Sequence, residues 1–159
     1  MKRQSEAGQE IVLFGVLLAV VIAVGSVLAV NLVWLRAEWM TLQETAFSAA
    51  AAGTVEVEGL PGVRRLDPDD AEKAARKLLA ENLAGLPFLD LEADQIAADA
   101  EVQVLNPPPG VCQPDPLGGP CHEVPFVTLN VKVPLRLPWG DWRLVLRVRA
   151  VAEAGESPQ

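Results

Sequence analysis

Tyrosine is absent from this chain of 159 residues, histidine occurs once, and aromatic residues make up only 5% of the sequence. Few aromatic rings leave little surface on which a sugar could stack. With His122 as the single histidine, no serine–histidine–acid set can be proposed. The chain also lacks a glycine-rich phosphate loop and a carboxylate pair in an apolar setting. We therefore expect no enzymatic activity and no cofactor.

Basic residues are scarce in the last two thirds of the chain. Residues 54–159 carry 10 Lys+Arg and 17 Asp+Glu, so most of the net charge of -8 lies there. Nucleic acids are bound through a basic footprint that neutralises phosphates. The composition therefore predicts a solvated acidic domain and no nucleic-acid partner.

Charge and proline are both missing from residues 11–30, a run of 20 residues. At about 1.5 Å per residue, such a helix spans roughly 30 Å, the thickness of a bilayer's hydrocarbon core. A cleaved signal peptide has a shorter apolar region and a small-x-small cleavage site. Here bulky residues 31–35 follow the run, which favours a retained transmembrane helix over residues 11–35, with the lipid bilayer as its surroundings.

The orientation of this helix is predicted from its flanks. Lys2, Arg3 and the terminal amine precede the apolar run, whereas Arg36 follows it near two glutamates. By the positive-inside rule, residues 1–10 are cytoplasmic and the carboxy-terminal domain lies outside the cytoplasmic (inner) membrane. Trp34 and Trp39 suit the outer membrane interface.

Helical periodicity continues beyond the predicted span. Apolar residues recur every three or four positions, which predicts one helix from about Gln9 to Ala52, ended by Gly53, with residues 36–53 outside the membrane. The face expected to pack on the chain's own sheet consists of Leu35, Trp39, Leu42, Ala46 and Ala49. Small residues inside the span favour helix–helix contact in lipid, although they also fit ordinary span composition. These are Gly15, Ala19, Gly25 and Ser26.

The remaining residues predict an α+β domain over 54–153, with one further helix packed on an antiparallel sheet. Asp67 and Pro68 begin that helix as cap and first residue; a calcium site with Asp69 and Asp70 is the alternative. Alternation of apolar and polar residues predicts strands at 54–58, 98–104, 127–137 and 142–152. A turn at 138–141 joins the last two. Pro134 suggests an edge position, and a disordered tail is expected over 154–159.

Arg143, Arg147 and Arg149 alternate along one face of the last predicted strand. They either pair with acids on the neighbouring strand or form a stripe that binds a partner. Sequence alone favours the pairing.

Cys112 and Cys121 flank a proline- and glycine-rich loop that has no apolar packing of its own. In an exported domain a disulfide is expected, with a stabilisation of about 2 to 3 kcal/mol for a loop of this length. Free thiols, or a metal pair with His122, are the alternatives. This spacing matches no zinc pattern, so we expect no metal.

Residues 8–14, Gly-Gln-Glu-Ile-Val-Leu-Phe, resemble the start of TadE/TadG-like pseudopilins of the tight-adherence (Tad) pilus and secretion system. Members of that family look like Gly-Gln-Ala-Leu-Val-Glu-Phe, followed by a long apolar helix and an alanine-rich stretch, here residues 42–53. The resemblance implies a prepilin-type cleavage between Gly8 and Gln9. Leu13 departs from the family, which carries an acid at that place.

The resemblance implies a membrane-anchored minor pilin that acts in assembly of a pilus or secretion apparatus by protein–protein packing. Its partners would be other pilin-like or pilus-assembly proteins and a prepilin peptidase, and the protein could itself enter a pilus. The alternative is a signal-anchored extracytoplasmic module that binds a ligand through the proline-rich loop between Cys112 and Cys121.

Overall fold

The computed structural model describes residues 3–55, 57–58, 65–137 and 143–155, and the side chains of residues 12–55, 65–137 and 143–155. The chain divides into two compact units, Met1–Glu38 and Trp39–Gln159. The elements in chain order are α1 (Arg3–Gly53), β1 (Val57–Glu58), β2 (Arg65–Leu66), α2 (Pro68–Leu83), α3 (Ala93–Ala98), β3 (Glu101–Leu105), β4 (Gln113–Pro114), β5 (Cys121–His122), β6 (Phe126–Arg136) and β7 (Arg143–Glu153).

Helix α1 provides all the secondary structure described in the first unit and continues into the second. The predicted end of this helix near Ala52 is confirmed, but the helix begins at Arg3 rather than near Gln9. Adding a residue to an existing helix gains a hydrogen bond without a new nucleation cost, so polar residues before the apolar run can join it.

The main sheet of the second unit is antiparallel, with the order β3-β6-β7. Strands β6 and β7 pair over their full length, from Phe126 opposite Glu153 to Arg136 opposite Arg143. This confirms the two long strands predicted from alternation. The predicted turn at 138–141 lies outside the described residues.

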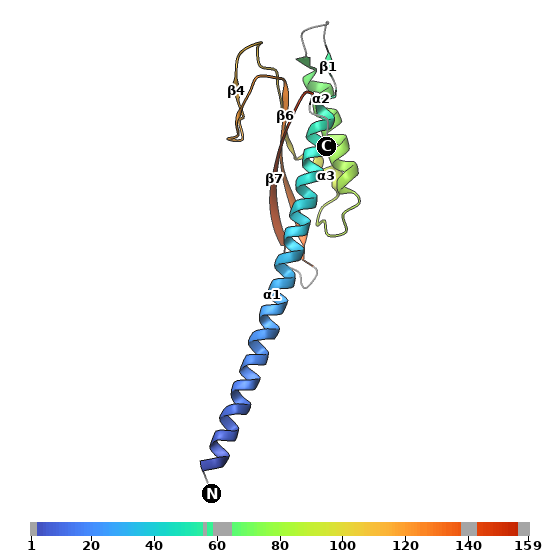
Figure 1. Ribbon diagram of the computed structural model, residues 1–159. Helices are drawn as coiled ribbons and strands as arrows, with labels where there is room; N and C mark the ends of the chain where they lie inside the picture. Colours follow the sequence, from blue (N-terminus) through green and yellow to red (C-terminus); the bar gives the residue numbers. More distant parts are fainter. Residues whose placement is uncertain (1–2, 56, 59–64, 138–142, 156–159) are drawn as a thin grey trace. The chain divides into compact units, whose positions relative to one another are not determined.

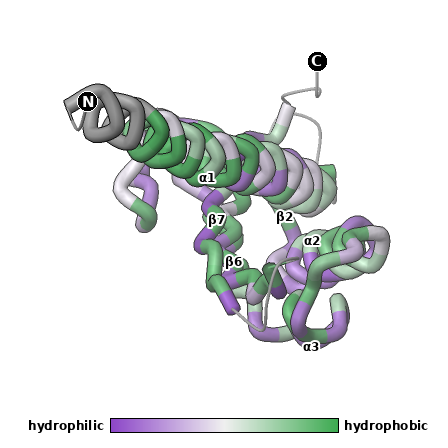
Figure 2. The backbone as a smooth tube through the Cα atoms, turned by 90° about the horizontal axis from the view of Figure 1, so that it is seen from below, coloured by the Kyte–Doolittle hydropathy of each residue, from purple (hydrophilic) through white to green (hydrophobic). Residues whose placement is uncertain are grey.

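The core lies between one face of this sheet and the helices, as expected (Figure 1). Hydrophobic and hydrophilic positions alternate along the strands (Figure 2). Alternate residues of β6 are therefore buried on the core face, where helical residues cover them. The buried residues of β6 are Val127, Leu129, Val131, Val133 and Leu135. Those of the helices include Leu42, Ala46, Ala49, Ala50, Ala71, Leu79, Leu83 and Ile96.

The strand predicted at 98–104 begins later than expected. Ala98 ends the short helix α3, and β3 starts at Glu101. Arg76 from α2 stabilises the end of α3, because its guanidinium donates to the carbonyl oxygens of Ala97 and Ala98 at 2.7 and 2.6 Å. The last carbonyls of a helix lack the usual i+4 amide partner, and here, within the described residues, only Ala97 also accepts from a nearby amide, that of Ala100 at 3.4 Å. The long-range contribution of Arg76 left no local signal in the sequence.

Two further predictions are corrected. Strand β6 is central rather than an edge, but β3 begins at Glu101, opposite Asn130, and covers β6 only from Phe126 to Asn130. Beyond Asn130, on the side toward Pro134, a single bridge between Leu89 and Leu135 remains. Proline is tolerated there because regular pairing has already ended on that side.

The prediction of a disordered tail over 154–159 is wrong at Ala154, which is buried and whose amide donates to the Pro125 carbonyl at 2.8 Å. Residues 156–159 lie outside the described residues.

The strand predicted at 54–58 is shorter in the structure, with β1 at Val57–Glu58. It pairs with β2, which the sequence analysis did not predict. The side chain of Asn106 holds β2 in place: its Oδ1 accepts from the Leu66 amide at 2.8 Å, and its Nδ2 donates to the Leu66 carbonyl at 3.0 Å.

Candidate functional site

Helix α1 contains the strongest functional signal in the chain. Its stretch Val12–Gly53 is long and apolar enough to cross a membrane, by length and composition. Side chains from Val12 to Val30 are exposed, and the most apolar window buries none of its surface within the chain. Exposing such an apolar surface to water is unfavourable. A surface of this kind marks a site of contact with a membrane or with another protein.

Three of the four small residues predicted for helix–helix contact share one face of α1. At 3.6 residues per turn, Gly15, Ala19 and Ser26 fall within about 40° of one another, whereas Gly25 lies about 80° to 120° from them. A Cβ added at Gly15 or Gly25 would meet no atom of the described chain within 4 Å. Ser26 Oγ donates to the Ile22 carbonyl at 2.8 Å, so its hydroxyl is satisfied within the helix.

The predicted cleavage point lies inside helical backbone, because Gly8 and Gln9 both belong to α1. Their side chains are outside the described set. Leu13, which stands where the resembling family carries an acid, is 71% exposed and follows the amino-terminal turns of the helix.

Part of the predicted packing face of α1 is buried. In the second unit, Leu42, Ala46 and Ala49 are fully packed, whereas Trp39 remains 44% exposed. Leu35 is half-buried and belongs to the first unit.

Gly53 has a role that the sequence analysis did not recognise. A Cβ added there would lie 2.9 Å from the Ala71 carbonyl oxygen and 3.3 Å from Val127 Cγ2. Gly53 therefore permits α1 to approach both α2 and β6 closely, in addition to ending the helix. A hydrogen bond also joins α1 to the sheet, because Gln43 Nε2 donates to the Arg149 carbonyl of β7 at 2.7 Å.

The predicted disulfide is present, since the sulfurs of Cys112 and Cys121 are bonded. This settles the alternatives for the pair: neither cysteine is a free thiol, so neither can act as a nucleophile beside His122 or as a metal thiolate. The bond joins the ends of the β4–β5 hairpin, in which Gln113 pairs with His122 and Pro114 with Cys121.

This hairpin packs on the sheet face opposite the helices (Figure 1). His122 is buried, stacks on Phe126 with ring centroids 4.3 Å apart, and its Nδ1 contacts Glu153 Oε1. Arg149 also donates to the Leu117 carbonyl at 3.3 Å. The single histidine thus anchors the loop to β6 and β7, a structural role that the loop's irregular composition did not reveal.

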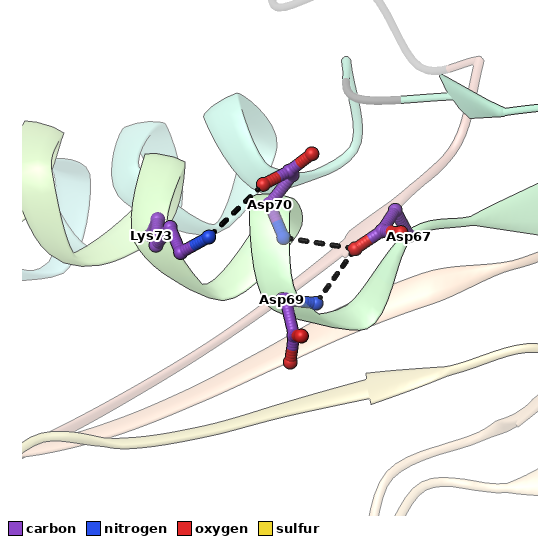
Figure 3. Close-up of polar contacts among 4 residues, drawn as sticks. All are labelled: Asp67, Asp69, Asp70 and Lys73. Carbon is purple, nitrogen blue, oxygen red and sulfur yellow. Dashed lines mark hydrogen bonds and ion pairs between the residues drawn. The ribbon is translucent and has the colours of Figure 1, made fainter.

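The aspartate cluster at the start of α2 is a helix cap (Figure 3). Asp67 Oδ1 accepts from the amides of Asp69 and Asp70 at 2.9 and 3.0 Å, which satisfies donors that the helix cannot pair. Asp70 accepts from Lys73 Nζ at 3.2 Å, and this hydrogen bond, with the charge of the same carboxylate, raises the pKa of Lys73. Asp67 and Asp70 therefore use their carboxylates within the helix, as the capping interpretation predicted.

The prediction that the strand arginines pair with acids opposite them is wrong. In the β6–β7 register, Arg143 faces Arg136, Arg147 faces Lys132 and Arg149 faces Asn130. The acid that pairs with Arg143 comes instead from the loop after α2, because Asp90 Oδ2 lies 3.0 Å from Arg143 Nε.

A shallow groove of about 470 Å³ runs along the exposed side of α2. It is lined by Ala52, Asp70, Lys73, Ala74, Lys77, Leu78 and Glu81. Its charged side chains pair with one another along the helix, as in Lys73 with Asp70 and Lys77 with Glu81. Such i,i+3 and i,i+4 pairs are ordinary features of a solvated helix surface.

In the part of the chain that the structure describes, no group of three or more His, Cys, Asp or Glu side chains could hold a metal ion. Comparison of the chain with protein-family models, with curated proteins and with solved structures finds no match. The features that bear on function are therefore the apolar helix, the second unit that contains its last residues, and the charged surface of that unit.

Proposed function

We propose that this protein is a single-pass membrane protein of the TadE/TadG-like pseudopilin kind, which acts in assembly of a pilus or secretion apparatus through protein–protein packing. The observation that carries the proposal is the change of surroundings along α1. Its apolar first half exposes every side chain from Val12 to Val30, while Ala46, Ala49 and Ala50 near its end are fully buried in an α+β unit. One helix thus suits an anchor at one end and a structural spine at the other.

The disulfide supports export of the carboxy-terminal unit. Disulfides persist in oxidising compartments and are rare in the cytosol. Cys112 and Cys121 are bonded, and Lys2 and Arg3 precede the apolar run. Both observations favour a cytoplasmic amino terminus and a second unit outside the cytoplasmic membrane.

The proposed packing partners are apolar helices in the same membrane. Leu13 replaces the acid of the resembling family, so no charge pair within the lipid would direct assembly. The face of Gly15, Ala19 and Ser26 has no partner within the described chain and permits close backbone approach, which favours helix association in lipid. Substituting Gly15→Leu should reduce crosslinking between copies or with partner helices, whereas Gly25→Leu, on another face, should have a smaller effect.

Intact mass of the protein purified from native membranes tests the pilin-like assignment. A chain that begins at Gln9 would support processing by a prepilin peptidase, and Gly8→Val should block that processing while Gly15→Val should not. A mass that retains residues 1–8 would contradict pilin-type processing and leave a permanent anchor. Extraction at alkaline pH tests the anchor itself: release of the chain from the membrane would contradict a transmembrane helix.

A binding module is the second candidate, and the β4–β5 hairpin favours it. The hairpin is crosslinked and held on the sheet by His122, yet its neighbour Val111 is 50% exposed. A preorganised exposed loop loses little entropy when it binds a ligand. Replacement of residues 115–119 that abolishes ligand binding but leaves assembly intact would favour this function over the first.

A further inference from the structure

The outer face of the β6–β7 hairpin carries a stripe of basic side chains in a unit that is otherwise acidic. This face is opposite the helical core, and all five cations on it are exposed. They are half of the ten lysines and arginines found in residues 54–159. The basic stripe consists of Lys132, Arg136, Arg143, Arg147 and Arg149.

Acids of the same unit neutralise the basic stripe only in part. Asp90, whose side chain is 6% exposed, serves two guanidiniums: its Oδ1 lies 3.2 Å from Arg136 and its Oδ2 3.0 Å from Arg143. Lys132 and Arg147 face each other and have no ion pair within the described residues. Like charges placed directly opposite each other destabilise a sheet, so an external anion would be favourable here.

Glu153 also lies on this face, where it contacts His122 Nδ1, and Glu101 is a further acid beside the face that is already engaged. Its Oε2 accepts from Asn130 at 3.2 Å and its Oε1 from Gln103 at 2.9 Å, along the border between β3 and β6.

The β4–β5 hairpin covers the opposite end of the face, where Phe126 and Thr128 are buried. Arg149 donates to Leu117 of the loop in this hairpin, so the uncovered part of the face is the part that carries the other four cations.

The basic stripe lies at the end of the second unit where the chain enters it. Gly53, at the end of α1, approaches Val127, whereas Gln43, ten residues earlier, contacts Arg149. The direction from Gly53 back to Trp39 along α1 is therefore the same as the direction from Val127 to Arg136 along β6. Trp39 begins the second unit, and only residues 31–38 separate it from the last residue of the apolar run.

We propose that the basic stripe binds the anionic phospholipid headgroups of the membrane in which α1 is anchored. The inference rests on the proposed membrane anchoring. Each Lys or Arg held near such a surface strengthens association about five-fold, but only within a Debye length of about 8 Å at physiological salt. Val145 is 56% exposed between the two facing pairs of cations, so the surface alternates basic and apolar groups, as a lipid interface requires.

A second copy of the chain fits this surface less well. The acids on the exposed side of α2 alternate with Lys73 and Lys77 and pair with them, so α2 does not present a surface of one sign. An anionic lipid surface has one sign throughout, and arginine guanidiniums bind phosphate groups in bidentate geometry. Charge complementarity therefore favours the membrane as the occupant.

The test uses the full chain in lipid nanodiscs, with a fluorophore attached through Val145→Cys. The native cysteines are bonded and do not react with the label. Nitroxide groups on lipid headgroups should quench the fluorophore more strongly in discs that contain phosphatidylglycerol than in discs of phosphatidylcholine. Lys132→Gln combined with Arg147→Gln should lower the docked-to-undocked ratio about 30-fold and abolish that difference. Lys73→Gln combined with Lys77→Gln, the matched control, should leave it unchanged.

Equal quenching in both lipids, or quenching that the Lys132 and Arg147 variant does not alter, would overturn the proposal. Energy transfer between labelled copies that replaces headgroup quenching would overturn it in favour of a second copy. A chain that fails to stay in the disc at alkaline pH would instead contradict the membrane anchor, so the two failures are distinguishable.

Discussion

Replacing Gly53 with alanine should destabilise the second unit although alanine is the better helix former. The added Cβ would lie 2.9 Å from the Ala71 carbonyl oxygen, a backbone atom that cannot move aside independently. Overpacking of this kind costs about 1 to 3 kcal/mol, centred near 2, and because Gly53 is the last residue of α1 the gain in helix propensity returns less than the roughly 0.5 to 1 kcal/mol of a helix interior. We therefore expect Gly53→Ala to lower the free energy of unfolding by about 1 to 2 kcal/mol.

The assay is thermal unfolding of the full chain in detergent micelles, followed by tryptophan fluorescence. For a unit of this size, the expected loss corresponds to a fall in Tm of about 4 to 8 °C. Gly85→Ala is the matched control, because its nearest atom, the Asn82 carbonyl oxygen, would be at an ordinary 3.8 Å. The control should be neutral or slightly stabilising, since alanine restricts the unfolded chain. A Gly53→Ala variant that melted at or above the wild-type temperature would show that close approach to Ala71 does not constrain this position.

Three further predictions concern local contacts of the second unit, each measured by denaturant unfolding in detergent. Asp67→Ala should cost about 1 kcal/mol through loss of the cap, whereas Asp67→Asn should retain most of it; equal losses would contradict capping. Asn106→Ala should cost about 1 to 3 kcal/mol, because Leu66 loses both partners of its backbone groups, and an unchanged midpoint would show that water replaces them. Cys112→Ser with Cys121→Ser should cost about 2 to 3 kcal/mol, and a reductant should destabilise the wild type equally but leave the variant unaffected.

The long elements could be predicted because each carries its own periodicity. The apolar run of residues 11–30 and the spacing that follows it indicate one helix, and α1 is one helix. Asp67 and Pro68 indicate the start of α2 through cap chemistry alone. Strands β6 and β7 each extend over eleven residues, which is long enough for alternation to be unambiguous.

The features that escaped prediction depend on contacts between distant residues. Helix α3 has six residues, too few for a helical period to emerge, and Arg76 caps it from α2. The β4–β5 hairpin consists largely of proline and glycine, so nothing local shows that His122 attaches it to Phe126. The sequence therefore predicts that helices cover one face of the sheet. In the structure the β4–β5 hairpin also covers one end of the opposite face.

Unlike these features, the basic stripe could have been predicted, because the length of the turn determines which cations of β6 and β7 face each other. A four-residue turn at 138–141 makes residues 137 and 142 partners, and stepping outward pairs 136 with 143, 132 with 147 and 130 with 149. These last three pairs are the register that the structure shows. Cross-strand neighbours follow from turn length, and a one-residue shift would have placed the arginines on the core face. Because register places cation opposite cation, the stripe cannot be neutralised between β6 and β7, and the only acid that reaches its cations in the described residues is Asp90. Its remaining charge is available to an anionic surface, which is why the lipid test discriminates between a solvated sheet and a docked one.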